Sequence, residues 1–407
     1  MDKGNFLVVI LILVTITIFF AFVEAKVAPK MVQQTSPNLI STNSPIPINP
    51  ILPDKSCSAM QNLPVPQAPS PQMSSNVRIF DNLLVYDLLQ QQSYSQPSLF
   101  ILDIGADGIF STPDDKPLQS VFDSLDTRII DFDLSGENLV WIRDANPWPF
   151  AELRMCGLDA CASNASELIF TKDNMYDLES KLTISGSRIA WTVHDLVNPT
   201  VTKIMFCDIT KNGANGGCLA TDKKQVMDLS LQLNEYVNEL RTTEKFGYVL
   251  TKTYPLMPVK LYIIDYDKLT FSVYYDEQID KEKIVDFHPV NLQQQNYDAM
   301  YILENNNSVV SVAIITDGKE RFSNRGRILA NKIIDSIVID RNGKSMFEFA
   351  YRERDSNGSN YYIKKMSPPK SYTLDKSYYQ QMGMMSYSKN SFVTINQNSL
   401  PAYMHCF

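Results

Sequence analysis

Thirteen residues, 103–115, read DIGADGIFSTPDD and have the oxygen-rich spacing of a calcium-binding loop. An EF-hand loop places oxygen ligands at positions 1, 3, 5, 7, 9 and 12 and a glycine at position 6, which is Gly108 here. The ligand positions fall on Asp103, Asp107, Ile109 (through its carbonyl), Ser111 and Asp114. Position 3 is a glycine, which has no side-chain oxygen. Position 12 is an aspartate, whose side chain is shorter than that of the usual glutamate. The loop therefore predicts a weak structural calcium site or, alternatively, an acidic solvated turn.

The six cysteines are spaced as disulfides would require. Cys156 and Cys161 bracket four residues, and Cys207 and Cys218 bracket ten. Opposed strands of a hairpin bring Cβ atoms within bridging distance, so each pair is predicted to form a local disulfide. Free buried thiols are the alternative. The last two cysteines, Cys57 and Cys406, are paired by elimination only, as a bridge between the two ends of the folded part.

Enzymatic chemistry has little support in the sequence. The three histidines, His194, His288 and His405, show no spacing typical of metal ligands. No G-x-S-x-G nucleophile motif is present, and acidic residues are too numerous to single out an acid and base pair. We therefore predict a non-enzyme. The alternative is a polysaccharide hydrolase or lyase, which predicts carboxylates clustered at a central channel.

The N-terminal region carries a targeting signal and a linker. An apolar run covers residues 6–23, which is typical of a secretory signal and, at about 18 residues, also close to the minimum for a membrane anchor. Residues 1–25 are thus a signal peptide or a retained span. Residues 26–77 hold ten of the 22 prolines among Ser, Asn and Gln, and are predicted to be a disordered linker. The net charge of −8 argues against nucleic acid as a partner.

Residues 78–407 repeat an apolar hairpin with a period of about fifty residues. Equivalent positions, 45 to 57 residues apart, fall on Tyr86, Trp141, Trp191, Tyr248, Tyr301, Phe349 and Thr394. Short alternating strands at this period predict an all-β chain of four-stranded blades in a seven-bladed β-propeller, with six or eight blades and a pair of β-sandwiches as alternatives. The two tryptophans are predicted to pack between blades. The final unit supplies about three strands, and a segment near Cys57 is the expected fourth.

The hairpin CDITKNGANGGC and the loop DIGADGIFSTPDD resemble those of exported β-propeller repeat proteins of archaea and bacteria, broadly the TolB-type class. The resemblance covers most of residues 78–407 and is strongest in the first three blades. It implies a propeller that binds or scaffolds outside the cytoplasm, and it does not by itself imply an enzyme.

The turns between the second and third strands of blades two to four are unusually apolar. They predict a partner-binding patch formed by Trp148, Phe150, Leu196, Tyr254 and Leu256, or else local packing of proline against aromatic rings. Three sequons make Asn164, Asn306 and Asn357 candidate glycosylation sites. Together these features predict an extracytoplasmic propeller, secreted or held by an N-terminal span, that binds a cell-surface protein or glycan. A purely structural envelope component is a further alternative.

Overall fold

The computed structural model describes residues 61–405 apart from short gaps between strands, the longest at 91–97, 122–128, 340–347 and 374–384. For residues 275–390 only the backbone is described. The folded unit spans Ile51–Phe407. The membrane-anchor prediction for residues 6–23 lies outside the described residues, and among the described residues no helix is long and apolar enough to span a membrane.

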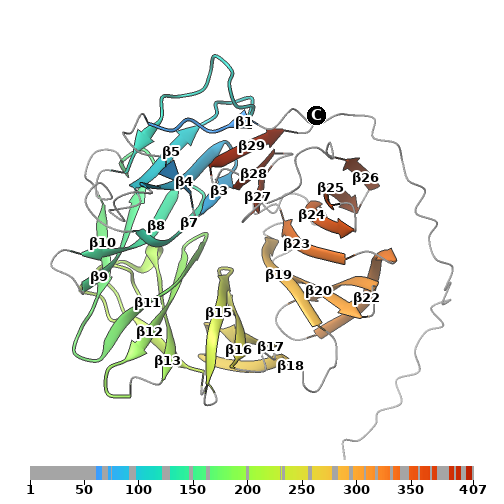
Figure 1. Ribbon diagram of the computed structural model, residues 1–407. Helices are drawn as coiled ribbons and strands as arrows, with labels where there is room; N and C mark the ends of the chain where they lie inside the picture. The colour runs from blue at the N-terminus through green and yellow to red at the C-terminus, as the bar shows by residue number, and fades with distance from the viewer. Residues whose placement is uncertain are drawn as a thin grey trace, which may run out of the picture. The chain divides into compact units, whose positions relative to one another are not determined.

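The described residues form seven antiparallel sheets (Figure 1). In five of them the strands lie in sequence order, whereas in the other two β2 pairs with β4 and β1 pairs with β29. The first sheet contains β2 (Gln72–Met73), β3 (Val77–Phe80), β4 (Leu83–Gln90), β5 (Ser98–Asp103) and β6 (Gln119–Ser120). The second contains β7 (Ile129–Ser135), β8 (Asn138–Ala145), β9 (Phe150–Gly157) and β10 (Glu167–Thr171). The third contains β11 (Tyr176–Ser185), β12 (Arg188–Asp195), β13 (Thr202–Asp208) and β14 (Gln225–Asp228), with the short 3-10 helix η3 (Ile209–Lys211) after β13.

The remaining four sheets repeat this meander. The fourth contains β15 (Glu235–Thr242), β16 (Phe246–Thr253), β17 (Val259–Asp265) and β18 (Thr270–Asp276). The fifth contains β19 (Lys283–Leu292), β20 (Tyr297–Asn306), β21 (Val309–Thr316) and β22 (Glu320–Ala330). The sixth contains β23 (Ile333–Ile339), β24 (Glu348–Asp355), β25 (Gly358–Met366) and β26 (Pro369–Thr373). The seventh contains β27 (Met385–Ser388), β28 (Ser391–Ile395), β29 (Pro401–His405) and β1 (Gln61–Asn62).

The sheets are joined through their first strands. In the order β3, β7, β11, β15, β19, β23 and β27, each first strand contacts the next, and β27 contacts β3. Because β27 of the last sheet contacts β3 of the first, the series of first-strand contacts ends at the sheet where it began. All seven equivalent positions predicted from the repeat fall on the second strand of a sheet, from Tyr86 in β4 to Thr394 in β28.

The hydrophobic core lies between neighbouring sheets, because each sheet alternates side chains between its two faces. Trp141 packs with residues of the first and second sheets, and Trp191 packs with residues of the second and third. Both indoles are fully buried, as are the equivalent Tyr86 and Tyr248. The prediction that the tryptophans pack between sheets is confirmed.

Two disulfides form within hairpins, as predicted. Cys156 bonds Cys161 with their Cα atoms 5.2 Å apart, and Cys207 bonds Cys218 at 5.1 Å. Each lies where the third strand of its sheet ends. The predicted Cys57–Cys406 bridge lies outside the described residues.

The fourth strand of the seventh sheet comes from the N-terminal side of the chain, as the sequence predicted. In β1, Gln61 pairs with Tyr403 and Asn62 pairs with Ala402. The N–H of Leu63 then donates to the carbonyl of Pro401 at 2.9 Å. Sheet structure thus begins before residue 78, since β1 and β2 both fall in the range assigned to the linker.

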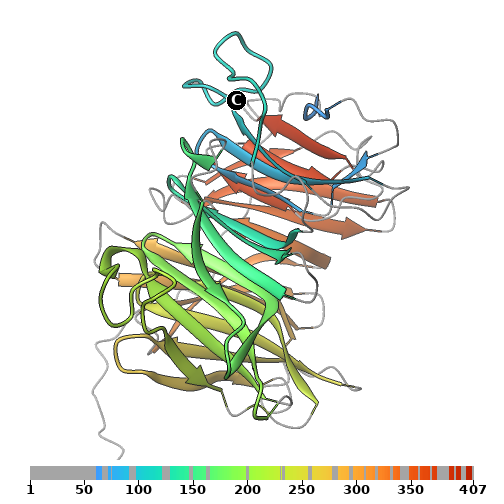
Figure 2. The same cartoon turned by 90° about the vertical axis from the view of Figure 1, so that its left-hand side faces the viewer.

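The acidic loop at residues 103–115, here called the closing loop, connects the first sheet to the seventh. It lies near the C-terminal strands in Figure 2. The Tyr403 hydroxyl donates to the Gly108 carbonyl at 2.6 Å, and the Phe110 ring meets the Tyr403 ring edge-on at 5.8 Å. Ser391 also donates to the Gly108 carbonyl, at 3.4 Å. Phe110 and Gly108 therefore connect the closing loop of the first sheet to Tyr403 of the seventh.

Removing the Tyr403 hydroxyl should weaken this connection. We expect Tyr403→Phe to lower the free energy of unfolding by about 1–2 kcal/mol, because the Gly108 carbonyl loses its shorter hydrogen bond. Chemical denaturation measures the change. Tyr254→Phe, on a tyrosine that is 64% exposed, is the control. Equal stability of wild type and Tyr403→Phe would contradict a closing role.

Candidate functional site

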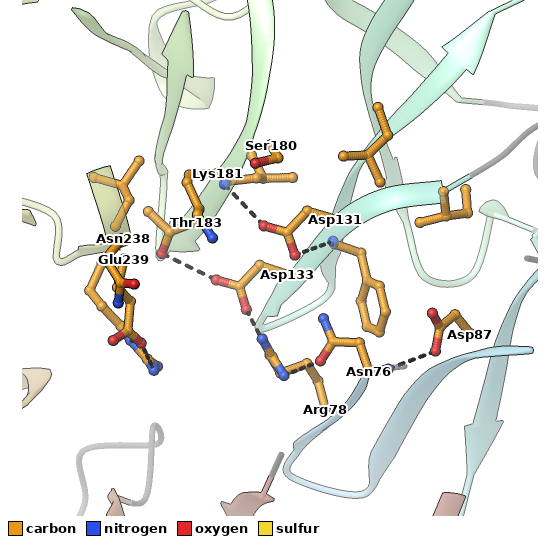
Figure 3. Close-up of a pocket in the computed structure, with 16 residues that line it drawn as sticks. Asn76, Arg78, Asp87, Asp131, Asp133, Ser180, Lys181, Thr183, Asn238 and Glu239 are labelled. Carbon is orange, nitrogen blue, oxygen red and sulfur yellow. Dashed lines mark hydrogen bonds and ion pairs between the residues drawn. The ribbon is translucent and has the colours of Figure 1, made fainter. Parts of the chain in front are cut away.

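A polar pocket of about 560 Å³ lies between the first strands of the first four sheets (Figure 3). Charged and amide side chains dominate its wall. They are Asn76, Arg78, Asp87, Asp131, Asp133, Lys181, Asn238, Glu239 and Arg241. Apolar side chains, Ile130 among them, complete the lining. Three residues that line the pocket from first strands are cross-strand partners of aromatic residues on second strands. These pairs are Phe132 with Trp141, Leu182 with Trp191, and Arg241 with Tyr248.

Register irregularities in the first strands shape this wall. The pairing shifts between Ile129 and Asp131 in β7, between Leu178 and Leu182 in β11, and between Val237 and Glu239 in β15. Similar shifts occur in β19 and β23. A bulge redirects side chains and frequently lies beside a binding site. In the first three strands named, residues at or beside the shift line the pocket.

Two aspartates of β7 hold the next sheet in place. Asp131 accepts a hydrogen bond from the backbone N–H of Leu182 at 3.2 Å, and Asp133 accepts one from Ile184 at 3.0 Å. Ser135 accepts a third from Gly186 at 3.0 Å. These alternate residues of β7 supply the acceptors that β11 requires, because buried N–H groups need partners. Their first role is structural.

Arg78 and Asp87, which belong to β3 and β4 of the first sheet, are also held by hydrogen bonds and an ion pair. The Arg78 guanidinium lies 3.9 Å from the Asp133 carboxylate and donates to the side-chain oxygen of Asn76. Asp87 accepts from the Asn76 N–H at 2.8 Å and from Ser74 at 3.0 Å. Figure 3 shows Arg78 between Asp133 and Asn76. This side of the wall is therefore held in place by its own hydrogen bonds and ion pair.

Asp131, in the pocket wall, has a pKa that is shifted into the mildly acidic range. Burial raises the pKa of Asp131 to about 6, the Arg78 charge opposes that rise, and the Asp133 charge adds to it. A carboxyl group of this pKa exchanges protons near pH 6, which is a property of acid and base catalysts as well as of buried structural groups.

The opposite wall offers charges from β11 and β15. Arg241 donates through Nε to the Glu239 carboxylate at 2.8 Å, so the two side chains hold each other. Lys181 lines the same space from β11. The pocket thus presents both hydrogen-bond donors and acceptors.

These pocket residues were missed by the sequence analysis. A signal was present, because β7 reads IIDFDLS and β15 reads EYVNELRT, with polar residues alternating inside first strands. Such alternation is also expected of any strand that faces water on one side, so it did not identify a site.

The predicted partner-binding patch is described in part. Leu196 is 36% exposed, its neighbour Val197 is 82% exposed, and Tyr254 is 64% exposed. Phe150 begins β9, but its side chain, like Trp148 and Leu256 entirely, lies outside the described residues. Of the sequons, Asn306 ends β20, and Asn164 and Asn357 are not described.

The three carboxylates predicted to bind calcium make hydrogen bonds or ion pairs within the closing loop or with Lys116, which follows it. Asp103 pairs with Lys116 at 2.7 Å, and Asp114 accepts from the Ala106 N–H at 2.8 Å. Asp107 accepts from the Ile109 N–H at 2.8 Å. A hydrogen bond from Thr112 holds the pKa of Asp114 below its usual value. Within the described part of the chain no three His, Cys, Asp or Glu residues converge as metal ligands. Calcium binding stays a prediction.

His194 and His405, whose side chains are described, make different contacts. The ring of His194 lies 2.7 Å from the Glu179 carboxylate, and this hydrogen bond raises the pKa of His194. His405 lies 2.8 Å from the Ser391 hydroxyl, but that serine is buried beside Tyr403. Neither histidine lines the pocket.

Comparison with solved structures places the fold among β-propellers. The chain superposes on a prolyl endopeptidase structure with a TM-score of 0.56 and 7% identity, covering 80% of this chain and 45% of that one. It superposes on an oligogalacturonate lyase from Vibrio parahaemolyticus with a TM-score of 0.55 and 8% identity, covering 86% and 96%. The β-propeller domain of the Trilobed protease from Pyrococcus furiosus matches with a TM-score of 0.50 and 10% identity, covering 82% and 93%.

The chain thus spans less than half the length of the prolyl endopeptidase it matches. No family model matches the sequence, and no curated protein matches it. At these identities the similarity shows the β-propeller fold alone.

The raised pKa of Asp131 predicts a pH-dependent stability. The folded state binds this proton more tightly than the unfolded chain, whose carboxyl has the ordinary value of 3.8. Asp131 therefore makes the free energy of unfolding fall as the pH rises from 3.8 to about 6.

The variant Asp131→Asn removes that titration. We expect its stability relative to wild type to increase over this pH interval and to level off above it. Denaturant unfolding at a series of pH values measures the difference, with the exposed Asp159→Asn variant as control. A difference that does not change with pH would refute the assigned shift.

Proposed function

We propose that this chain is an extracytoplasmic, seven-bladed β-propeller of the TolB-type class that binds a glycan in its central pocket. Seven described sheets whose first strands contact one another in a cycle support the blade number. The two disulfides are consistent with an oxidising compartment. In this proposal the N-terminal segment secretes the domain or holds it at the membrane through the linker.

The composition of the pocket wall carries the proposal of a glycan ligand. Sugar hydroxyl groups both donate and accept hydrogen bonds, so they require donors and acceptors at close spacing. The pocket supplies carboxylates and cationic donors in 560 Å³, which lies within the usual range of about 300–1,000 Å³ for small-ligand sites. The partly exposed Ile130 adds an apolar surface for a sugar ring. Fixed wall groups lower the entropy lost on binding.

A protein partner is supported by a different surface. Leu196, Val197 and Tyr254 expose apolar side chains on turns of the third and fourth sheets, where polar residues are usual. This patch would bind a cell-surface protein through the turns rather than through the pocket.

A polysaccharide hydrolase or lyase is the second candidate. The observation that favours it is Asp131, a pocket carboxyl group with a pKa of about 6 beside Arg78. A lyase acting on oligogalacturonate also has this fold over 96% of its length. In this reading Asp131 exchanges a proton with the bound sugar, and Arg78, Lys181 and Arg241 bind its acidic groups.

Binding of a panel of neutral and acidic oligosaccharides to the full chain tests the glycan proposal. We expect Lys181→Ala and Glu239→Gln to weaken binding about tenfold or more, since each removes a wall group. Val197→Ala, outside the pocket, should bind as wild type does. Loss of binding in Val197→Ala but not in the pocket variants would reject the pocket. Analysis of the incubated sugars for shortened or unsaturated products separates binding from catalysis.

Calcium binding by the closing loop is proposed as a structural addition. If the ion stabilises the loop, millimolar calcium should raise the melting temperature of the wild type, and a chelator should reverse the increase. Asp107→Asn should reduce the response. An identical melting temperature with calcium and with chelator would reject the site.

A further inference from the structure

Strand β11 has the largest register shift among the described first strands. Its pairing passes from Leu178 opposite Val193 to Leu182 opposite Trp191, so four positions along β11 correspond to two along β12. The shifts in β7, β15, β19 and β23 each insert one residue, whereas the shift in β11 inserts two. Because inserted residues leave the regular ladder, their side chains can be aimed away from it.

The inserted segment, residues 179–181, divides its side chains between two environments. Ser180 and Lys181 line the pocket (Figure 3). Glu179 does not line it, and its carboxylate lies 2.7 Å from the ring of His194. The bulge therefore presents a lysine to the pocket while the neighbouring acid is held by a different partner.

Lys181 differs from the other two cations of the pocket in having no counter-charge. Arg78 is ion-paired with Asp133, and Arg241 is ion-paired with Glu239. Within the part of the chain that the structure describes, the Lys181 ammonium makes no hydrogen bond or ion pair. The side chain is only partly exposed, so its charge loses some hydration without gaining a fixed partner.

The four carboxylates of the pocket are already engaged by groups of the wall. Asp87 and Asp131 accept hydrogen bonds from backbone N–H groups. Asp133 and Glu239 are the acids paired with the two arginines. The acidic groups are thus compensated within the wall, and the uncompensated charge on the β11–β15 side is positive.

We propose that the pocket selects acidic over neutral glycans and that Lys181 binds the anionic group of the sugar, a carboxylate or a sulfate. This inference rests on the glycan-binding function proposed above and names the class of glycan. A hydrogen bond from an ammonium to an anion is stronger than one between neutral groups. Ser180 and Asn238, which line the pocket from β11 and β15, can bind the neutral hydroxyl groups of the same sugar.

Titration calorimetry of the full chain in detergent, with three disaccharides matched in linkage, tests the selectivity. They are built from galactose, from galacturonic acid and from sulfated galactose. We expect the wild type to bind at least one acidic disaccharide about tenfold or more tightly than the neutral one. Lys181→Gln keeps a hydrogen-bond donor but removes the charge, so it should lose this preference and bind the neutral disaccharide as the wild type does. The acid that is preferred identifies carboxylate or sulfate as the anionic group.

The matched control is Lys223→Gln, which removes the same charge from an exposed lysine of the third sheet outside the pocket and should keep the preference. Equal affinity of the wild type for the three disaccharides would overturn the inference while leaving glycan binding in place. So would a preference that Lys181→Gln retains. Binding of none of the three would reject the proposed glycan-binding function, and this inference with it.

The dependence of binding on ionic strength gives a second measurement. Added salt screens charge pairs, so it should weaken binding of the preferred acidic disaccharide more in the wild type than in Lys181→Gln. The same salt dependence in both proteins would contradict a direct contact between Lys181 and the anionic group.

Discussion

The structure depends on how the first strands of neighbouring sheets satisfy their backbone N–H groups. Between the second and third sheets these strands approach each other without forming a ladder, and side chains supply the acceptors instead. Asp131, Asp133 and Ser135, at every second position of β7, accept from Leu182, Ile184 and Gly186 of β11. The polar groups that line the pocket therefore also join two sheets, so binding and stability share the same atoms.

This sharing limits which pocket groups are available to a ligand. Asp87 and Asp133 already accept two hydrogen bonds each, and Arg78 is held between Asp133 and Asn76. Asp131 likewise accepts two hydrogen bonds, from the N–H groups of Phe132 and Leu182, and its burial raises its pKa to about 6. Lys181, Glu239 and Arg241 lie on the facing strands. A ligand is thus expected to bind chiefly on the β11–β15 side of the pocket.

Much of the fold was predictable because it follows from local patterns. The period of about fifty residues placed all seven equivalent positions on second strands, and cysteine spacing identified both hairpin disulfides. The pocket was not predictable, since it arises where shifted registers in β7, β11 and β15 bring distant residues together. Asp131 and Leu182 are 51 positions apart, and nothing local in either segment indicates their contact.

The closing loop shows the same limit. Its acidic spacing suggested a metal site, but its connection to Tyr403 spans 295 positions of sequence. Its carboxylates accept hydrogen bonds from the loop's own N–H groups, and Asp103 pairs with Lys116. These bonds hold the Gly108 carbonyl and Phe110 toward the seventh sheet without requiring an ion. A calcium ion would compete with Lys116 and with the backbone donors for the same oxygens, so any affinity is expected to be weak. The loop's acidic residues are better explained by the need to fold a long turn against the last sheet.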